Sequence, residues 1–513
     1  MKSLRYIVLL LMLAVAVGSC EQEWPVYPPP DDDTDTTDPG DPSAGSADFS
    51  KFVVVGNSLT AGFQANALFN LGQMNSIGSM MAQQFAAVGG GEFIQPDINS
   101  ENGFNSLFSD LSDPNPANWV VAGRLILAGD PPLPTPTVSD LGAVPVPPVN
   151  PGFIYSGPTV SNFSVPGILL GQALIPQTGD WTLAGMDPRF NPFYGRFASN
   201  PGTSTLIGDA VAAAGSFFLL WLGSNDVLLY AVTGASGQAP LTSETDFAFQ
   251  YAAALSIMTT DPGIQGVIGN IPDVTSLPYF NLVPWNSVEF EEGEPLIGLI
   301  NQAYAVYNGG LAQASGMGLI TPEEAQRRTI QFAGGGNGIV VSDETLTDLS
   351  GLGLPSIRQA SEADQMGLSS GFVLGELADP NNPLSVIGVA VPLADEFTLL
   401  AHELELVQAR TEAFNTIIEN VISLIGVDDR VAFADINQTY RDLVADSPLL
   451  IDGVSVSAGL APPTGIFSED GVHPNSRGYA ITANAFIEAI NSKFGANVHN
   501  VDISQFPGTG LPQ

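Results

Sequence analysis

Three short segments of the sequence carry residue types suited to nucleophilic chemistry. In the first, GNSLTAGF, Ser58 directly follows an apolar run and precedes a helical pattern, so it is expected at a strand-to-helix turn. Backbone N–H groups at such a turn are free to face an anion. By itself this pattern is more typical of a capped turn than of a nucleophile. Two further segments supply a context for it: GSND at 223–226 and DGVHP at 470–474.

These segments resemble the sequence blocks of a known hydrolase family. GNSLTAGF looks like the first block of the GDSL/SGNH hydrolase superfamily, GSND like the third and DGVHPN like the fifth. Residues 162–167, NFSVPG, are similar to the second block. The stretch NIPDVTSLPYF at 270–280 resembles the bacterial lipoprotein-type GDSL esterases and lipases. One departure is Asn57, which stands where the family usually has Asp. The four blocks follow the family's order, so we expect this chain to be a member.

The resemblance assigns a role to each candidate site residue. It implies that Ser58 attacks an acyl carbon, that His473 takes the serine proton and returns it to the leaving alcohol, and that Asp470 fixes the imidazole tautomer. The oxyanion would be held by the Ser58 N–H, the Gly167 N–H and the Asn225 side-chain amide. A histidine suits this task because its pKa lies near neutrality.

The activity that follows is hydrolysis of carboxylic esters through an acyl-enzyme. Both acyl or lipid esters and O-acetylated glycans are open as substrates. The alternative is a surface lipoprotein that keeps a hydrolase scaffold and only binds a ligand, since a fold does not fix a function. We expect no cofactor and no metal: the chain has no nucleotide-binding glycine motif, and His402-Glu403-Leu404-Glu405-Leu406 is not H-E-x-x-H. His402 is expected on a helix surface, and His499 in solvent.

Short apolar runs ending in Gly, Asn or Asp alternate with helical patterns from Lys51 onward, as in a parallel α/β sheet. The predicted fold is a three-layer α/β/α sandwich, flavodoxin-like in the sense of the SGNH family, spanning 50–495. Its five predicted strands are Phe52–Val55, Val160–Phe163, Ser216–Leu222, Gly266–Ile271 and Val431–Ile436. Helices are predicted after Ser243, over about Leu399–Leu424 and over about Tyr479–Phe494.

Two stretches exceed a minimal sandwich and are predicted to be insertions, at about 90–158 and 281–395. In the second, a helix is expected to start at Thr321-Pro322, and a hairpin is expected around the GGGNG of 334–338. Residues 496–513 are expected to form a C-terminal tail.

The N-terminus resembles an export signal. Lys2 and Arg5 precede an apolar run too short to span a bilayer, which predicts a signal peptide over 1–19. The run ends at Cys20, the only cysteine, in a sequence that resembles a bacterial lipobox. Residues 20–49, rich in Pro and Asp, are expected to be a disordered tether behind a lipidated Cys20. The protein would then be exported and anchored by lipid to the bacterial outer membrane or cell surface.

The charge of the chain excludes some partners. Its 14 Lys and Arg against 53 Asp and Glu give a net charge of −39, which repels phosphate backbones, so nucleic acid is not expected as a partner. A solvated acidic surface and adaptation to a saline habitat both remain open. The expected partners are an ester substrate and, through the anchor alone, a membrane; the protein is expected to be a monomer.

Overall fold

The computed structural model describes residues 40–110, 115, 118–129, 133–141 and 153–509. The predicted signal peptide, Cys20 and most of the predicted tether lie outside the described residues. The described residues divide into two compact units. The sheet unit is drawn from Tyr27–Leu228, Leu241–Val274 and Ala409–Gln513, and the insert unit from Leu229–Pro240 and Thr275–Gln408.

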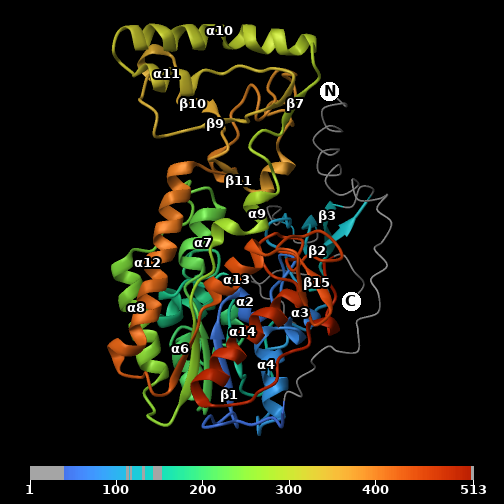
Figure 1. The fold of residues 1–513 in the computed structure, drawn as a ribbon, viewed down its shortest axis with the longest axis vertical. Coiled ribbons are helices and arrows are strands. Elements are labelled where there is room, and N and C mark those ends of the chain that lie inside the picture. The colour runs from blue at the N-terminus through green and yellow to red at the C-terminus, as the bar shows by residue number, and fades with distance from the viewer. Residues whose placement is uncertain (1–39, 111–114, 116–117, 130–132, 142–152, 510–513) are drawn as a thin grey trace. The chain divides into compact units, whose positions relative to one another are not determined.

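A five-stranded parallel sheet forms the centre of the sheet unit (Figure 1). Its strands are β1 (Phe52–Gly56), β4 (Asn162–Ser164), β5 (Phe217–Trp221), β6 (Gln265–Gly269) and β13 (Val431–Ala434). Their order across the sheet is β13-β6-β5-β1-β4, and every pair is parallel. The five predicted strands are confirmed, with ends shifted by one or two residues.

The sheet is buried on both faces. Every residue of β1 and β5 is buried, and both strands are continuous apolar runs, as expected when helices cover the two sides of a parallel sheet. Helices α4 (Ile77–Ala86) and α14 (Ser476–Phe494) lie on one side, and α6 (Leu206–Ala212) and α8 (Glu244–Met258) on the other (Figure 1). The chain is therefore an α/β protein whose sheet is flanked by helices, consistent with a three-layer sandwich.

The predicted helices are present. Ser243 accepts the N–H of Asp246 and caps α8, and the other two predicted segments form α12 (Ala401–Ile425) and α14. On α12 the apolar side chains of Val407, Phe414 and Ile418, which recur at helical spacing, are buried. The remaining helices of the sheet unit are α2 (Ser58–Ala61), α3 (Asn70–Met74), α5 (Pro192–Gly195), α7 (Asn225–Val232), which ends in the insert unit, and α13 (Ile436–Ala445).

The first predicted insertion, 90–158, packs on the sheet unit where it is described. It contains the antiparallel pair β2 (Ala122–Ala128) and β3 (Leu133–Val138). Its buried apolar side chains Ile98, Leu141 and Phe153 form one cluster with Ala61 and Leu68. This region therefore packs beside the turn that follows β1.

Both ends of the described chain contact the sheet unit. Residues 40–49, from the predicted tether, include Ser43, which pairs with Asn497, and the buried Phe49. In the predicted C-terminal tail, Ile503 is buried, while His499 is half-buried with its ring Nε2 3.0 Å from the carbonyl oxygen of Gly40. A further antiparallel pair, β14 (Leu449–Ile451) and β15 (Val454–Val456), precedes the DGVHP segment.

The insert unit contains the second predicted insertion, 281–395, and has its own apolar core. Its helices are α9 (Pro278–Asn281), α10 (Pro295–Gly316) and α11 (Pro322–Arg328). Its strands are β7 (Val288–Phe290), β8 (Gly335–Asn337), β9 (Val340–Ser342), β10 (Ile357–Gln359), β11 (Gln365–Met366) and β12 (Thr398–Leu399). Thr321 caps α11 as predicted.

The prediction of a hairpin around GGGNG is wrong. These residues form β8, which pairs antiparallel with the distant β7, so that Gly335 lies opposite Phe290. The ring of Phe290 meets that of Phe332 at 5.8 Å in the core of the unit. Burial of these two rings against each other favours the long-range pairing over a local turn.

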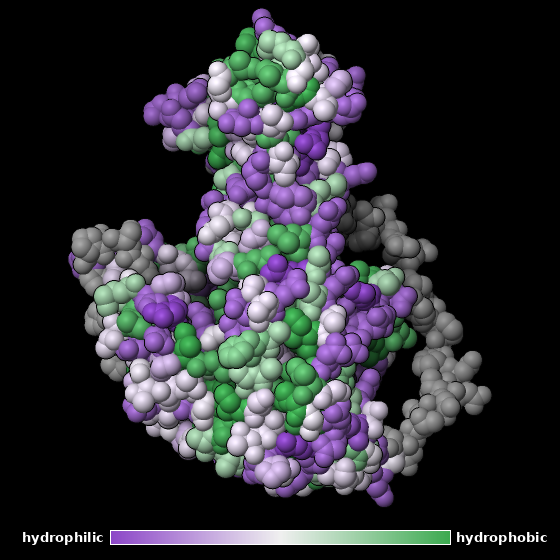
Figure 2. All heavy atoms as spheres, turned by 90° about the vertical axis from the view of Figure 1, so that its left-hand side faces the viewer, coloured by the Kyte–Doolittle hydropathy of each residue, from purple (hydrophilic) through white to green (hydrophobic). Residues whose placement is uncertain are grey.

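The surface is mixed in character. Figure 2 shows hydrophilic and hydrophobic residues intermixed over one face, as expected for a chain with 13% charged and 44% hydrophobic residues. Among the described helices, none combines the length and apolar character needed to cross a bilayer.

Candidate active site

The strand order favours the carboxyl ends of β1 and β5 as the place where a ligand binds. Numbered among themselves in chain order, the five strands run 2-1-3-4-5 across the sheet, so the order reverses between the first strand and the third. In open α/β sheets, ligands bind outside the carboxyl ends of the strands at this reversal. Ser58 follows β1 by two residues and Asn225 follows β5 by four, which puts both candidates at the expected place.

The register of the sheet brings Gly167 to the same edge. Gly56 lies opposite Ser164 of β4 and Trp221 of β5, so the three strands end together. The N–H of Val165 donates to the Gly56 carbonyl oxygen at 3.0 Å. Ser58, Gly167 and Asn225 therefore lie in segments that follow the carboxyl ends of three neighbouring strands.

Ser58 is the first residue of the four-residue helix α2. The side chain of Asn57 caps this helix by accepting the Leu59 N–H at 3.0 Å. A side chain at Gly56 would meet the Thr60 hydroxyl at 2.0 Å, so the turn requires glycine there. Ser58 itself is only 5% exposed. The turn thus holds Ser58 in a fixed position with little exposure to solvent.

Asp470 and His473 form a hydrogen-bonded pair. The ring Nδ1 of His473 lies 2.9 Å from Oδ2 of Asp470, and both side chains are largely buried. Oδ1 of Asp470 also accepts the backbone N–H groups of Val472 and His473, at 2.9 and 2.8 Å. Burial alone would raise the pKa of Asp470, but the neighbouring ring and these N–H donors hold it below its ordinary value. The carboxylate is therefore charged near neutral pH and able to orient the imidazole.

Two backbone N–H groups tie the Asp470 loop to the segment after α2. The N–H of Asn66 donates to Oδ2 of Asp470 at 2.8 Å, and the N–H of Ala65 donates to the hydroxyl of Ser468 at 2.9 Å. Ala65 and Asn66 both have positive φ, 51° and 59°, an uncommon backbone conformation for residues other than glycine. Such strained residues cluster at functional sites.

Sequence patterns do not reveal these three anchoring residues. Asn tolerates a left-handed backbone, so Asn66 carries a weak signal, whereas Ala65 and Ser468 carry none. Their contribution depends on a contact between segments about 400 residues apart in the chain.

A ring contact connects His473 to the serine turn. The rings of Phe63 and His473 have centroids 4.9 Å apart, and the N–H of Phe63 donates to the carbonyl oxygen of Ser58 at 3.0 Å. Among the described residues, no hydrogen bond joins the Ser58 hydroxyl to the His473 ring. Hydrogen bonds of this kind often form only when substrate is bound.

The candidate oxyanion donors differ in exposure. Gly167 is exposed with φ +73°, and a Cβ added there would meet nothing within 4 Å. Asn225, the first residue of α7, is buried, and its Nδ2 donates to the carbonyl oxygen of Ile168 at 2.9 Å. An amide nitrogen has two hydrogens, so one remains for a ligand. The bond to Ile168 holds the Gly167 loop against Asn225.

Two buried polar atoms at this edge have no hydrogen-bond partner among the described residues. They are Nδ2 of Asn57 and the hydroxyl of Ser224, which directly precede Ser58 and Asn225. Buried polar atoms are nearly always paired, so unpaired ones next to both candidates are consistent with a ligand site.

Asp226 supports the same loop from within the protein. Its Oδ2 accepts the N–H of Leu170 at 2.9 Å, and its Oδ1 accepts the Thr242 hydroxyl at 2.8 Å. Burial raises the pKa of Asp226 to about 6 despite these donors. The residue is placed to fix the Gly167 loop.

Of the three histidines, His473 is the one that contacts the serine turn; His402 lies in the insert unit and His499 near the C-terminus. The candidate residues therefore stand at strand ends of one sheet and in the loop that carries Asp470 and His473. No protein-family model matches this chain, and no curated protein matches it.

Proposed function

We propose that this chain is a serine ester hydrolase of the GDSL/SGNH type, with Ser58 as nucleophile. The observation that carries the proposal is the Asp470–His473 pair, 2.9 Å apart, in a loop bonded through Asn66 to the segment that follows Ser58. A carboxylate on one ring nitrogen leaves the other free to act as a base.

Each step of the reaction uses groups at this edge of the sheet. Ser58 Oγ attacks the ester carbonyl carbon while its proton passes to Nε2 of His473. The tetrahedral intermediate collapses, the proton moves from His473 to the leaving alcohol, and the acyl group stays on Ser58. Water then attacks the acyl-enzyme, gives a proton to His473, and the acid leaves as Oγ recovers that proton.

The negative charge of the intermediate would be held by three donors: the N–H groups of Ser58 and Gly167 and the free amide hydrogen of Asn225. Each such donor typically lowers the barrier by about 3 kcal/mol. Because Gly167 is exposed while Ser58 and Asn225 are buried, substrate would enter from the side of the Gly167 loop. Acyl or lipid esters and O-acetylated glycans both carry the required carbonyl.

The test is hydrolysis of p-nitrophenyl esters of increasing acyl length and of acetylated glycans by the detergent-solubilised full chain. Ser58→Ala should abolish turnover and prevent labelling by a fluorophosphonate probe, which the parent should carry on Ser58. Ser370→Ala, at another buried serine without a side-chain partner among the described residues, is the matched control and should retain turnover. Turnover that survives in Ser58→Ala contradicts the proposal. A parent that binds but cleaves none of these esters favours the ligand-binding alternative.

We also propose that Cys20 carries a lipid that anchors the exported protein to the outer membrane or cell surface, because it is the only cysteine and follows a signal-like segment. Cys20→Ala should move the protein from the membrane fraction to the soluble fraction of a bacterial host. A parent found in the soluble fraction without detergent would argue against the anchor.

A further inference from the structure

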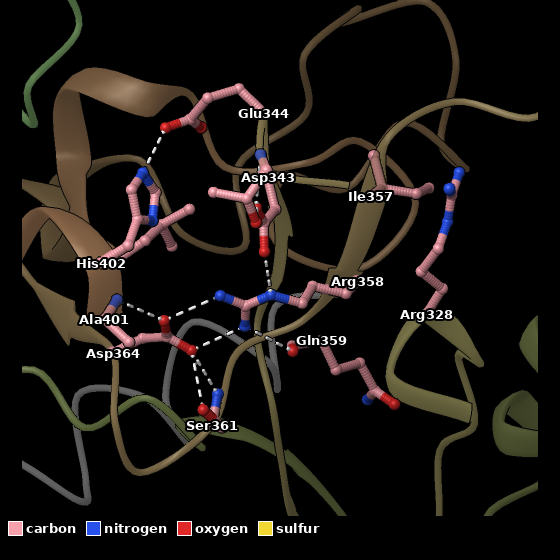
Figure 3. A network of polar contacts seen from close by, with 12 residues as sticks. Arg328, Asp343, Glu344, Ile357, Arg358, Gln359, Ser361, Asp364, Ala401 and His402 are labelled. Carbon is pink, nitrogen blue, oxygen red and sulfur yellow. Dashed lines mark hydrogen bonds and ion pairs between the residues drawn. The ribbon is translucent and has the colours of Figure 1, made fainter. Parts of the chain in front are cut away.

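A second group of polar side chains with metal-ligand chemistry lies within the insert unit. His402 and Glu403 belong to the first turn of α12, and Glu344 follows β9. Figure 3 shows Glu344 above His402, with the two side chains in contact. Glu344 and His402 are 58 residues apart in the chain, so no local sequence pattern predicts the hydrogen bond between their side chains.

The three side chains converge on one point. One ligand atom from each lies within 4.8 Å of the other two, and Nε2 of His402 is 2.7 Å from Oε1 of Glu344. A zinc ion held at about 2.0–2.2 Å from nitrogen and carboxylate oxygen sets tetrahedral ligand atoms about 3.3–3.6 Å apart, which lies between the 2.7 Å of the His402–Glu344 pair and the 4.8 Å limit of the set. Small side-chain adjustments would therefore suffice to place all three around one ion.

The burial of Glu403 is a separate observation that favours a cation at this site. The residue is only 3% exposed, and its Oε2 accepts the Leu400 N–H at 2.8 Å. Among the described residues no group donates to Oε1. Glu344, Asp395 and Asp343 all lie close enough to act on Glu403 with negative charge. A buried carboxyl group in such surroundings is stabilised either by keeping its proton or by binding a cation.

Arg358, the arginine in this region, is already paired with two other carboxylates. Arg358 binds Asp343 through Nε at 2.5 Å and Asp364 through both terminal nitrogens at 2.7 and 2.8 Å. The two carboxylates therefore exceed its single charge, and none of it is left for Glu403.

The same network gives the three side chains a rigid support. Oδ1 of Asp364 accepts the N–H of Ala401 at 3.1 Å, and Asp343 directly precedes Glu344 (Figure 3). Arg358 thus connects the start of α12 to the end of β9. A supported set of ligands loses little entropy when an ion binds.

We propose that Glu344, His402 and Glu403 form a binding site for a divalent transition metal ion, with Zn²⁺ as the best match. Imidazole nitrogen with two carboxylates suits zinc, whereas calcium and magnesium prefer oxygen ligands alone. The side chains of His402 and Glu344 are 42% and 58% exposed, so water can complete the coordination. The ion would bind β9 to α12 and stabilise the insert unit, independently of ester hydrolysis.

The test measures Zn²⁺ bound by the full chain after treatment with a chelator and its removal, by calorimetry and elemental analysis. The parent should bind one tight equivalent, and its thermal unfolding should shift upward on adding Zn²⁺. Glu403→Gln is the key variant, since Gln can still accept the Leu400 N–H and removes a buried charge, so it should fold. It should bind that equivalent at least about tenfold more weakly, because even loss of a group that only orients a ligand costs about 10- to 100-fold.

Three further variants and a calcium competition test whether zinc binds at these side chains. His402→Gln should lose the same equivalent, whereas His499→Gln, at a half-buried histidine of the sheet unit, and His473→Gln, in the candidate active site, should keep it. Excess Ca²⁺ should not displace Zn²⁺. The proposal fails if the parent retains no tight zinc, if Glu403→Gln and His402→Gln bind it as the parent does, or if Ca²⁺ competes equally, which would indicate a general attraction of cations to acidic residues.

Discussion

The two units of the molecule use buried polar groups in opposite ways. In the sheet unit, the strands β1 and β5 are apolar throughout, and the candidate catalytic side chains come after the strand ends, as Ser58 and Asn225 do at the starts of α2 and α7. In the insert unit, the strands have two or three residues, and a charged network around Arg358 lies inside the fold.

This contrast indicates what a buried polar residue does in each unit. A five-stranded sheet is held together by apolar burial and a regular ladder, so polar residues at its edge are free to serve a reaction. A unit with such short strands has few ladder bonds, and its polar side chains must connect the segments. We therefore expect substitutions of the polar residues that follow β1 and β5 to alter reactivity in the sheet unit, and substitutions in the Arg358 network to alter stability in the insert unit.

Asp470→Asn should have the greatest effect of the substitutions considered. The amide oxygen can still accept the N–H groups of Val472 and His473, but the amide nitrogen then faces Nδ1 of His473 and favours the wrong tautomer, so kcat should fall by about 10⁴-fold. Steady-state hydrolysis of a p-nitrophenyl ester measures this, with a thermal melt close to that of the parent. A kcat within tenfold of the parent would remove Asp470 from the reaction.

Next comes Arg358→Met in the insert unit. The change leaves Asp343 and Asp364 buried without their cation, which should cost about 3–5 kcal/mol of unfolding free energy. Hydrogen exchange of insert-unit peptides reports it locally. The matched control is Arg189→Met, which breaks a 2.6 Å ion pair with Asp187 where the arginine side chain is 54% exposed; it should change the unfolding free energy far less, because exposed ion pairs contribute little. Equal effects in both variants would contradict the comparison.

A somewhat smaller effect is expected for Asn225→Ala in the sheet unit. Loss of one oxyanion donor should lower kcat by about 10²–10³-fold with little change in KM, because the donor acts mainly in the transition state. The readout is the separation of kcat from KM across substrate concentrations. A rise in KM at constant kcat would instead mark Asn225 as a ground-state binding residue.

The mildest effect concerns pH and Asp226. Its pKa is raised by burial from 3.8 to about 6, so the folded state holds the proton more tightly than the unfolded state. The contribution of Asp226 to stability is therefore fully present below about pH 4 and is lost as pH rises through about 6, by up to about 3 kcal/mol for a shift near two units. Asp226→Asn should remove this loss.

Denaturant unfolding of parent and Asp226→Asn between pH 4 and 8 measures the difference. The variant should gain on the parent across this window, since an amide can serve both Leu170 and Thr242 without carrying a charge. A difference that does not change with pH would show that Asp226 is not the titrating group.

Much of the sheet unit follows from local sequence. Short apolar runs bounded by turn residues, such as Phe52–Gly56 and Phe217–Trp221, favour buried strands, and Ser243 marks the start of α8 as expected. The spacing of Asp470 and His473 suffices to bring their side chains together, because the bond closes within one loop.

Contacts between segments far apart in the chain follow only from the tertiary structure. The strand order that brings the ends of β1 and β5 together, the bond from Asn66 to Asp470 and the pairing of β7 with β8 are examples. So is the contact of Glu344 with His402, which no motif spacing predicts. Local patterns encode burial and turns within a few residues, whereas these contacts depend on which buried surfaces meet, and that is fixed only when the whole chain packs.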